Sequence, residues 1–393
     1  MESEPRISFE DTANAFSYKS DKELKKAHFI FSTVNHPWIS AMAQGSVKLA
    51  LNLRLPIEGI IRTTVFDHFV GGISIEDSED VIQKLGQFGV GTILDYSVEG
   101  EDAEASFDAT TNEILKTIEK AGKSKFMPFS VFKVTGMGST ELLEKIQKGA
   151  KLSSEEVASF QRLRARVEKL CSAAYEHKVP ILVDAEETWI QDPIDMLADE
   201  MMAKFNKEEA IVFNTYQLYR TASLSNLKKA HKNAVDNNYF LGAKIVRGAY
   251  MEKERARAID MGYPSPIQET KEASDKAFNE ALLFCIDHID KISFMCGSHN
   301  EYSNLYLTKL MAERNIKRND PRVWFAQLFG MSDNISFNLA KQGYKVAKYV
   351  PYGPVRSVMP YLFRRAAENT SVAGQSSREL TMIRKELARR KGK

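Results

Sequence analysis

The residues best suited to chemistry lie near the C-terminus, in the segment Tyr361-Leu-Phe-Arg-Arg-Ala-Ala-Glu-Asn369. Residues three or four positions apart share one face of a helix, so Tyr361, Arg364, Arg365 and Glu368 can border one pocket. Two adjacent guanidinium groups offer a rigid set of donors for bidentate binding of a carboxylate or a phosphate. The segment therefore predicts an anion-binding helix. The alternative interpretation is a solvated basic turn in which the arginines pair with Glu368.

Lys133 and Asp184 are charged residues within apolar sequences, Ser-Val-Phe-Lys-Val-Thr and Ile-Leu-Val-Asp-Ala-Glu. A buried charge is costly unless it is paired, so we expect a salt bridge between these two side chains. The pair can be a stabilising core contact, or Lys133 can be a Schiff-base lysine as in class I aldolases. Other polar residues at the ends of apolar segments are Asp95 and Glu99, Glu186 and Glu187, Asn214 with Gln217, Lys244 with Arg247, Ser298-His299-Asn300, Gln327, and Tyr349.

Short apolar segments from residue 90 onward are expected to position these side chains. They alternate with longer segments of helical period, which is typical of repeated βα units. Each is nearly continuous in apolar residues, as expected for strands buried on both faces. The pattern indicates a distorted, TIM-like (β/α)8 barrel of the α/β class, whose active site lies at the C-terminal strand ends. The predicted strands are Val90–Ser97, Phe129–Thr135, Pro180–Glu186, Ala210–Gln217, Gly242–Ala249, Ile292–His299, Val323–Gly330 and Tyr344–Gly353.

Local signals mark the starts of several intervening helices. Ser153-x-x-Glu156 is a capping box, and Asp192-Pro193 and Ser265-Pro266 each place a cap residue before a proline at the first helical position. We expect a helical N-terminal extension packed on the barrel, the catalytic barrel itself, and a basic C-terminal helix or tail. These three parts are predicted at residues 1–89, 90–375 and 376–393.

Composition is that of a soluble globular enzyme, with 43% hydrophobic and 27% charged residues and no apolar segment long enough to span a bilayer. A formal charge of +2 gives no long-range field for duplex nucleic acid, so nucleic acid is not an expected partner. No GxGxxG occurs between a strand and a helix, and the cysteines and histidines show no metal-ligand spacing. A Rossmann domain, a disulfide framework and a metal site are therefore not expected.

The N-terminus, Met-Glu-Ser-Glu-Pro-Arg, has neither a signal-peptide nor a transit-peptide pattern, which together with three scattered cysteines predicts a cytoplasmic location. The basic residues after Arg378 have two interpretations. They form a solvated terminus, or they anchor the protein to anionic lipid headgroups on the inner face of a membrane.

Several longer motifs resemble the proline dehydrogenases, flavoenzymes with a distorted (β/α)8 barrel that binds FAD without a Rossmann domain. Gly242-Ala-Lys-Ile-Val-Arg-Gly-Ala-Tyr250 is similar to the flavin-binding strand of this family, and the Tyr361–Asn369 segment is similar to its substrate helix. Bifunctional bacterial members usually carry arginine in place of Lys244 and glutamine in place of Asn214. The segments that resemble the monofunctional, mitochondrial-type branch are Val183-Asp-Ala-Glu-Glu187, Phe213-Asn-Thr-Tyr-Gln217, Ser298-His-Asn300 and Tyr349-Val-Pro-Tyr-Gly-Pro354.

The resemblance implies oxidation of L-proline to Δ1-pyrroline-5-carboxylate, the first step of proline catabolism, with hydride transfer to flavin N5 and a membrane quinone as electron acceptor. It implies that Arg364 and Arg365 hold the proline carboxylate, with Glu99 pairing to Arg364 as a gate. Lys133, oriented by Asp184, contributes to the same carboxylate end. The implied walls of the pyrrolidine ring are Leu328, Tyr349 and Tyr361.

The resemblance also assigns the cofactor residues. Asn214 and Lys244 address the isoalloxazine ring. The residues implied for the ring and the pyrophosphate are Val246, Arg247, Gly248, Ala249 and Tyr250. The residues implied for the rest of FAD are Ser298, His299, Asn300, Gln327 and Glu368.

Three alternative functions remain open. Hydroxyproline dehydrogenase shares the fold, the cofactor and the arginine pair, but relatives specific for hydroxyproline tend to have a small residue where this chain has Tyr349. Because a bulky phenol there crowds a 4-hydroxyl group, proline is the expected substrate. Outside this family, the residues also allow an aldolase-type lyase that uses Lys133, or a flavin-free binding protein for small carboxylates.

Overall fold

A computed structural model describes residues 7–34, 58–97, 103–371 and 375–392. Residues 34, 60, 366–371 and 375–377 are described by their main chain alone. The chain forms two compact units, which are described separately below. Unit 1 comprises Met1–Glu99 and Gln327–Lys393, and unit 2 comprises Gly100–Ala326.

Eight parallel strands form one sheet among the described residues, in the order β1-β8-β7-β6-β5-β4-β3-β2. The expected TIM-like (β/α)8 barrel is therefore confirmed, and each observed strand lies within or next to a predicted one. Every strand except β4 ends earlier than predicted, so that polar residues such as Lys133 and Asp184 follow them directly. The strands are β1 (Val90–Tyr96), β2 (Ser130–Phe132), β3 (Ile181–Val183), β4 (Val212–Gln217), β5 (Leu241–Val246), β6 (Ile292–Gly297), β7 (Val323–Leu328) and β8 (Val346–Tyr352).

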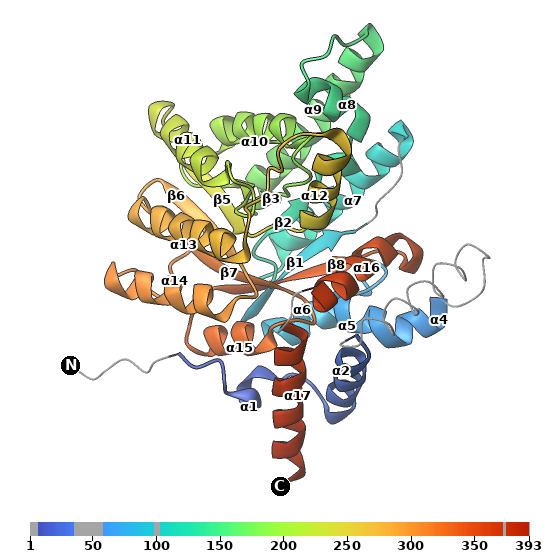
Figure 1. The fold of residues 1–393 in the computed structure, drawn as a ribbon, viewed down its shortest axis with the longest axis vertical. Helices are drawn as coiled ribbons and strands as arrows, with labels where there is room; N and C mark the ends of the chain where they lie inside the picture. The colour runs from blue at the N-terminus through green and yellow to red at the C-terminus, as the bar shows by residue number, and fades with distance from the viewer. Residues whose placement is uncertain (1–6, 35–57, 98–102, 372–374, 393) are drawn as a thin grey trace. The chain divides into compact units, whose positions relative to one another are not determined.

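Unit 2 contains β2 to β6 and most of β7, with helices packed on the outer face of the strands. Helices α10 and α11 pack against β4. Figure 1 shows α13 beside β5 and β6. Inside, the ring of Phe129 lies edge-on against Phe213 and Trp324, with centroids 5.5 and 5.2 Å apart. The helices are α7 (Glu104–Lys123), α8 (Thr140–Gln147), α9 (Ser154–His177), α10 (Gln191–Phe205), α11 (Ser223–Asp236), α12 (Met251–Met261), α13 (Lys271–Asp287) and α14 (Glu301–Glu313), with a 3-10 turn η2 at Val134–Gly136.

The predicted start of α9 is confirmed, whereas the predicted N-cap of α10 is two residues too late. At α9 the Ser153 side chain accepts from the Glu156 main-chain N–H at 3.2 Å, and Glu156 accepts from the Ser153 N–H at 2.8 Å. The predicted cap at Asp192 is wrong, because α10 already begins at Gln191. Ile190 occupies its N-cap position and gives no side-chain hydrogen bond.

The predicted helix start at Ser265-Pro266 is also wrong. The next helix, α13, is capped by Thr270, whose hydroxyl accepts from the Ala273 N–H at 3.1 Å. The intervening residues are held in a turn instead, because Ile267 forms an antiparallel bridge with Arg220. A proline after serine fits either a helix start or such a turn.

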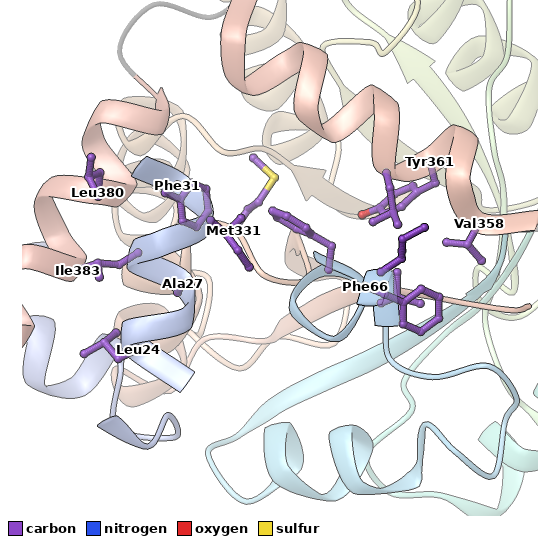
Figure 2. Packing of buried hydrophobic residues seen from close by; sticks show 14 of the residues in the cluster. Leu24, Ala27, Phe31, Phe66, Met331, Val358, Tyr361, Leu380 and Ile383 are labelled. Atoms are coloured by element: carbon purple, nitrogen blue, oxygen red, sulfur yellow. The ribbon is translucent and has the colours of Figure 1, made fainter. Parts of the chain in front are cut away.

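Unit 1 contains β1, β8, the end of β7 and helices from both ends of the chain. Its hydrophobic cluster includes Leu24, Phe31, Phe66, Val358 and Ile383 (Figure 2). These apolar residues bury the facing sides of α2, α16 and α17, and this burial sets the position of α16. The helices are α1 (Thr12–Ala15), α2 (Asp21–Val34), α4 (Glu58–Ile61), the π-helix η1 (Arg62–Phe66), α5 (Asp67–Phe69), α6 (Glu79–Gly86), α15 (Asp333–Lys341), α16 (Val355–Ser371) and α17 (Gln375–Lys391).

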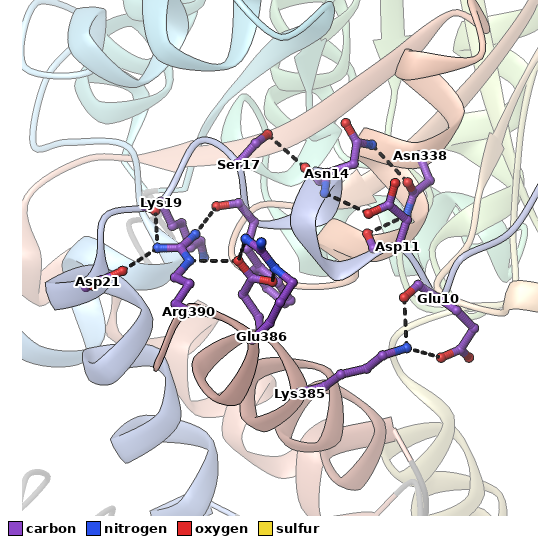
Figure 3. Close-up of polar contacts among 12 residues, drawn as sticks. Glu10, Asp11, Asn14, Ser17, Lys19, Asp21, Asn338, Lys385, Glu386 and Arg390 are labelled. Atoms are coloured by element: carbon purple, nitrogen blue, oxygen red, sulfur yellow. Dashed lines mark hydrogen bonds and ion pairs between the residues drawn. The ribbon is translucent and has the colours of Figure 1, made fainter. Parts of the chain in front are cut away.

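The basic helix α17 is in large part paired with the N-terminal segment of unit 1 (Figure 3). Arg390 donates to the carbonyl of Phe16 at 2.9 Å and to the Asp21 carboxylate at 2.7 Å. Glu386, fully buried, accepts from Arg389 at 2.8 Å and from Arg390 at 2.7 Å. These charges therefore hold the two ends of the chain together, a role that neither interpretation of the tail included. None of the helices among the described residues is long and apolar enough to cross a bilayer.

A second polar cluster of unit 1 is buried around Asp333, at the start of α15. Lys348 of β8 lies 3.0 Å and Lys19 lies 3.1 Å from its carboxylate, and the Tyr18 hydroxyl donates to it at 2.7 Å. Glu379 of α17 accepts from the main-chain N–H of Ser332, next to Asp333. Burial, with the nearby charge of Asp333, raises the pKa of Glu379 to about 7.

We predict that Glu379→Gln makes stability less sensitive to pH. The pKa of Glu379 rises on folding from 4.5 to about 7, so the folded protein holds a proton that the unfolded chain releases between these values. Raising the pH through this window therefore lowers the free energy of unfolding of the wild type, by roughly 3 kcal/mol at most. Urea unfolding should show the variant near wild-type stability at pH 5 and above it at pH 8.

Glu386→Gln is the matched control on the same helix. Burial raises the pKa of Glu386, but hydrogen bonds from Arg389, Arg390 and Thr12 outweigh it and lower the pKa to about 2. This carboxylate is ionised at both pH values, so its loss should cost a similar ~1–3 kcal/mol at pH 5 and pH 8. A Glu379→Gln effect that is equally independent of pH would contradict the prediction.

Candidate active site

Asp184 and Lys244 form a buried ion pair in unit 2. Asp184 follows β3 and Lys244 lies within β5, and their side chains are 12% and 8% exposed. Pairing offsets the desolvation that either charge would suffer alone. The sequence did not anticipate Lys244, and the predicted pairing of Asp184 with Lys133 stays a prediction. Asp184, predicted for the substrate side, therefore contacts Lys244, predicted for the flavin ring.

Lys133, directly after β2, lies near a second buried carboxylate, Glu186. Glu186 accepts from the main-chain N–H of Thr135 at 3.0 Å and from the Thr135 hydroxyl. Burial raises the pKa of Glu186 to about 7, although the Thr135 hydrogen bonds and the charge of Lys133 oppose the rise. Because Thr135 is two residues beyond Lys133, this contact fixes the segment that carries the lysine. Glu186 was noted from the sequence only as a polar strand end.

Gly248 forms the turn between β5 and α12. Its φ is +136°, and a Cβ atom there would lie 2.2 Å from the ring of Tyr219, so only glycine suits the position. Gly248 and Ala249 are exposed. Tyr250 is the N-cap residue of α12 and gives the helix no side-chain hydrogen bond. The first N–H groups of α12 thus lack a side-chain cap, which is the setting in which helix N-termini bind phosphate.

Arg247, Ser298 and Asn300 form one hydrogen-bonded group. Arg247 donates to the Ser298 hydroxyl at 2.8 Å, and the same oxygen accepts from the Asn300 N–H at 3.1 Å. Asn300 is also the N-cap of α14, where its side chain accepts from the Ser303 N–H at 3.0 Å. His299 lies between them and is half-buried. The predicted cofactor residues after β5 and β6 are therefore brought together.

Asn214 lies apart from that group. Its side-chain amide donates to Asp195 of α10 at 2.9 Å, so it faces the helix layer. Lys244 is in register with Thr215, and neighbouring residues of a strand point to opposite faces. The structure thus does not bring Asn214 and Lys244 together, although both were predicted to contact the flavin ring. Gln217, in register with Val246, lies on the face opposite Asn214 and was not assigned a cofactor role from the sequence.

In unit 1, Arg365 is buried on α16 against Tyr361. Arg365 is 6% exposed, and its guanidinium carbon lies 5.0 Å from the centre of the Tyr361 ring. The predicted sharing of one helical face by these two residues is confirmed. Arg364 is half-buried beside them. Tyr361 also belongs to the hydrophobic cluster of unit 1 (Figure 2). Residues of α2 and α17 in this cluster therefore help to hold the Tyr361 ring on which Arg365 packs.

The remaining unit 1 residues lie on β7 and β8. Tyr349 is 9% exposed, and its carbonyl accepts from the Phe329 N–H at 2.8 Å. The carbonyl of Leu328 accepts from the Lys348 ammonium at 3.4 Å, which links this predicted substrate wall to the cluster around Asp333.

Gln327 faces the helix layer of unit 1. Its side-chain oxygen accepts from the Ser336 hydroxyl of α15 at 2.7 Å, and the residue is 2% exposed. Glu99 and the side chain of Glu368 lie outside the part of the chain that the structure describes.

The residues of unit 2 that were predicted to bind the cofactor have chemistry that fits a dinucleotide of the FAD type. The turn at Gly248 brings exposed main chain to the start of α12 without a Cβ atom in the way. An ammonium group at Lys244 and the polar Ser298–Asn300 segment add donors suited to a flavin ring and phosphates. The fold and these strand ends define the class of this protein, an enzyme of the (β/α)8-barrel type.

Comparison with known proteins gives the family. A family model described as proline dehydrogenase matches residues 78–378. The chain is 33% identical over 426 residues to mitochondrial proline dehydrogenase 1 of Dictyostelium discoideum, a match that covers 97% of this chain and 74% of that protein. It is 29% identical over 421 residues to hydroxyproline dehydrogenase of Xenopus laevis, covering 98% of this chain and 90% of that protein. The chain belongs to the proline dehydrogenase family.

A solved structure shows the same fold. Proline utilization A from Bdellovibrio bacteriovorus, inactivated by N-propargylglycine, matches with a TM-score of 0.70 at 19% identity. The match covers 93% of this chain and 37% of that one, so the chain spans little more than a third of that larger protein. At this identity the likeness supports the barrel architecture.

We predict that Gly248→Ala disturbs the turn before α12 more than its matched control, Gly262→Ala. Both glycines flank α12 with positive φ, but nothing lies within 4 Å of a Cβ atom at Gly262. The control should cost ~1 kcal/mol of backbone strain. Gly248→Ala should cost ~1–3 kcal/mol more, because it displaces Tyr219 and because a φ of +136° is more strained for alanine than +69°. Urea unfolding and the flavin content of the purified protein measure both effects. Equal losses for the two variants would mean that the Tyr219 contact does not constrain the turn.

Proposed function

We propose that this chain oxidises L-proline to Δ1-pyrroline-5-carboxylate with FAD as its cofactor. The observation that carries the proposal is the buried guanidinium of Arg365, supported by the Tyr361 ring on the helix after the last strand. A planar guanidinium binds an anion such as a carboxylate in a bidentate manner. Membership of the proline dehydrogenase family supports an amino acid carboxylate as that anion.

The residues of unit 1 bind and orient the substrate in this proposal. Arg364 and Arg365 bind the carboxylate, while Tyr361, Tyr349 and Leu328 provide the walls of the ring. The i,i+4 contact between Tyr361 and Arg365 holds the guanidinium in one orientation. Such fixed orientation of a small, rigid substrate is a large part of catalysis.

The residues of unit 2 bind the cofactor. FAD, when bound, would supply the oxidising group, as a hydride acceptor at flavin N5 for the carbon next to the proline nitrogen. Gly248, Ala249 and the start of α12 bind the pyrophosphate. Lys244, held by Asp184, donates toward the flavin ring. Lys133, whose segment Glu186 fixes, adds a positive charge for the substrate.

A membrane quinone as electron acceptor is part of the same proposal. With it goes a cytoplasmic location and peripheral contact with the inner face of a membrane. The contact is supported by the exposed basic residues of α17, such as Arg384 and Lys391, on a helix that otherwise packs within unit 1. The Dictyostelium relative is named as mitochondrial.

Hydroxyproline dehydrogenase is the second candidate, favoured by the similarity to the Xenopus protein over nearly the whole chain. Tyr349 supports proline instead, because its buried phenol leaves less room for a 4-hydroxyl group. The two substrates separate the candidates. A faster reduction of a quinone analogue with trans-4-hydroxyproline than with proline, at equal low concentration, would overturn the assignment to proline.

For the carboxylate site, we predict that Arg365→Ala raises the KM for proline by a factor that corresponds to ~2–5 kcal/mol, because it removes one partner of a buried charge pair. Arg356→Ala is the control on the same helix. Arg356 is 49% exposed and pairs with Glu58, so its loss should leave KM unchanged. Steady-state kinetics with proline test both variants. An unchanged KM in Arg365→Ala would remove this residue from the substrate site.

For the cofactor, we predict that the protein purified with added FAD is yellow and that proline bleaches its visible absorption under anaerobic conditions. The reason is that proline reduces the bound flavin when no acceptor is present. A colourless protein that still binds proline would favour a flavin-free binding protein. Covalent trapping of Lys133 by borohydride in the presence of substrate would favour an aldolase-type lyase.

A further inference from the structure

Arg247 contacts three separate elements of unit 2 through three nitrogen atoms. Its Nε donates to Asp275 of α13 at 2.6 Å, its Nη1 to Ser298 after β6 at 2.8 Å, and its Nη2 to Ser303 of α14 at 2.9 Å. The guanidinium carbon also lies 4.3 Å from the centre of the Phe278 ring. A residue at the end of β5 therefore joins α13, the segment after β6, and α14.

The acceptors around Arg247 are themselves fixed. Ser303 is fully buried and donates onward to Asn279 of α13 at 2.8 Å. The Ser298 hydroxyl also accepts from the Asn300 N–H. Asn304 of α14 donates to the carbonyls of Ser298 at 3.0 Å and Asn300 at 2.8 Å. The Ser298–Asn300 segment is thus held by α14 on one side and by Arg247 on the other.

This geometry needs a guanidinium group. The three acceptors of Arg247 surround a planar fork, and a lysine ammonium is a point charge that cannot present donors in this arrangement. The positive charge is already paired with Asp275, whose second oxygen accepts from Lys271 at 2.6 Å. Protein atoms therefore accept from three of the five N–H donors of Arg247, one on each nitrogen.

We propose that Arg247 is a positioning residue, which holds the Ser298–Asn300 segment in place for FAD and does not bind the cofactor phosphates itself. This inference rests on the proposed function and revises the role that the sequence suggested for Arg247. It predicts that FAD binding depends on the shape of the hydrogen-bonded group and not on the positive charge alone. Removing the Ser303 hydroxyl should then weaken FAD binding, because this buried group links Arg247 to Asn279 and so helps to hold the segment.

The test titrates FAD into the deflavinated full-length chain and measures the dissociation constant and the visible circular dichroism of the bound flavin. The variants are Arg247→Lys, which keeps the charge, and Ser303→Ala, which keeps the guanidinium. Loss of a buried hydrogen bond corresponds to about a fivefold to tenfold weaker dissociation constant, and we expect this in both variants, with an altered flavin spectrum. Lys271→Ala is the matched control, because it removes the exposed partner of Asp275 and leaves the three Arg247 contacts in place. It should stay within about twofold of wild type, as expected for an exposed ion pair.

The outcomes separate the inference from the proposed function. Normal FAD binding in Ser303→Ala together with near-normal binding in Arg247→Lys would show that charge alone is needed, and would overturn the positioning role. If Arg247→Lys does not fold, the Ser303→Ala titration decides by itself. Wild-type protein that takes up no FAD overturns the proposed function and the inference with it. Weakened binding in Lys271→Ala equal to that in Ser303→Ala would also overturn the inference, because the effect would then follow from general destabilisation.

Discussion

Charges buried in the interior have to be paired, and this requirement organises both units of the molecule. In unit 1, Asp333 gathers Lys348 from β8 and Lys19 from the N-terminal segment. In unit 2, Asp184 takes Lys244 as its partner. Breaking any such pair leaves an uncompensated charge, which is among the costliest changes in a protein interior. The segments that carry these residues are therefore fixed relative to their neighbours within each unit.

The strands and one capping box could be predicted from the sequence because their signals are local. A strand buried on both faces is a continuous apolar run, and the bonds between Ser153 and Glu156 span only three residues. The errors at Asp192 and Ser265 have another origin. A polar residue followed by proline can lie inside the first turn of a helix, as Asp192-Pro193 does, or in a loop, as Ser265-Pro266 does. Contacts with distant residues such as Arg220 decide between these outcomes.

The candidate site was predictable in type but not in detail. Arg365 and Tyr361 share a helical face, so their contact follows from their spacing. The faces of β4 could not be assigned in the same way, because apolar residues occur at both alternating sets of positions in Val-Phe-Asn-Thr-Tyr-Gln. The contact of Asn214 with Asp195 shows which face meets α10. The pairing of Asp184 with Lys244 was likewise hidden, because it depends on how the strands are arranged in space.

The position of α17 bears on how the molecule is made. Arg390 binds Asp21, a residue 369 positions earlier in the chain, and its helix packs against α2. During synthesis on the ribosome the apolar face of α2 therefore emerges long before the helix that covers it. Contacts of such long sequence separation form late in folding, and apolar surfaces that await them favour association with other chains. The apolar face of α2 thus stays uncovered by α17 until translation has passed the barrel.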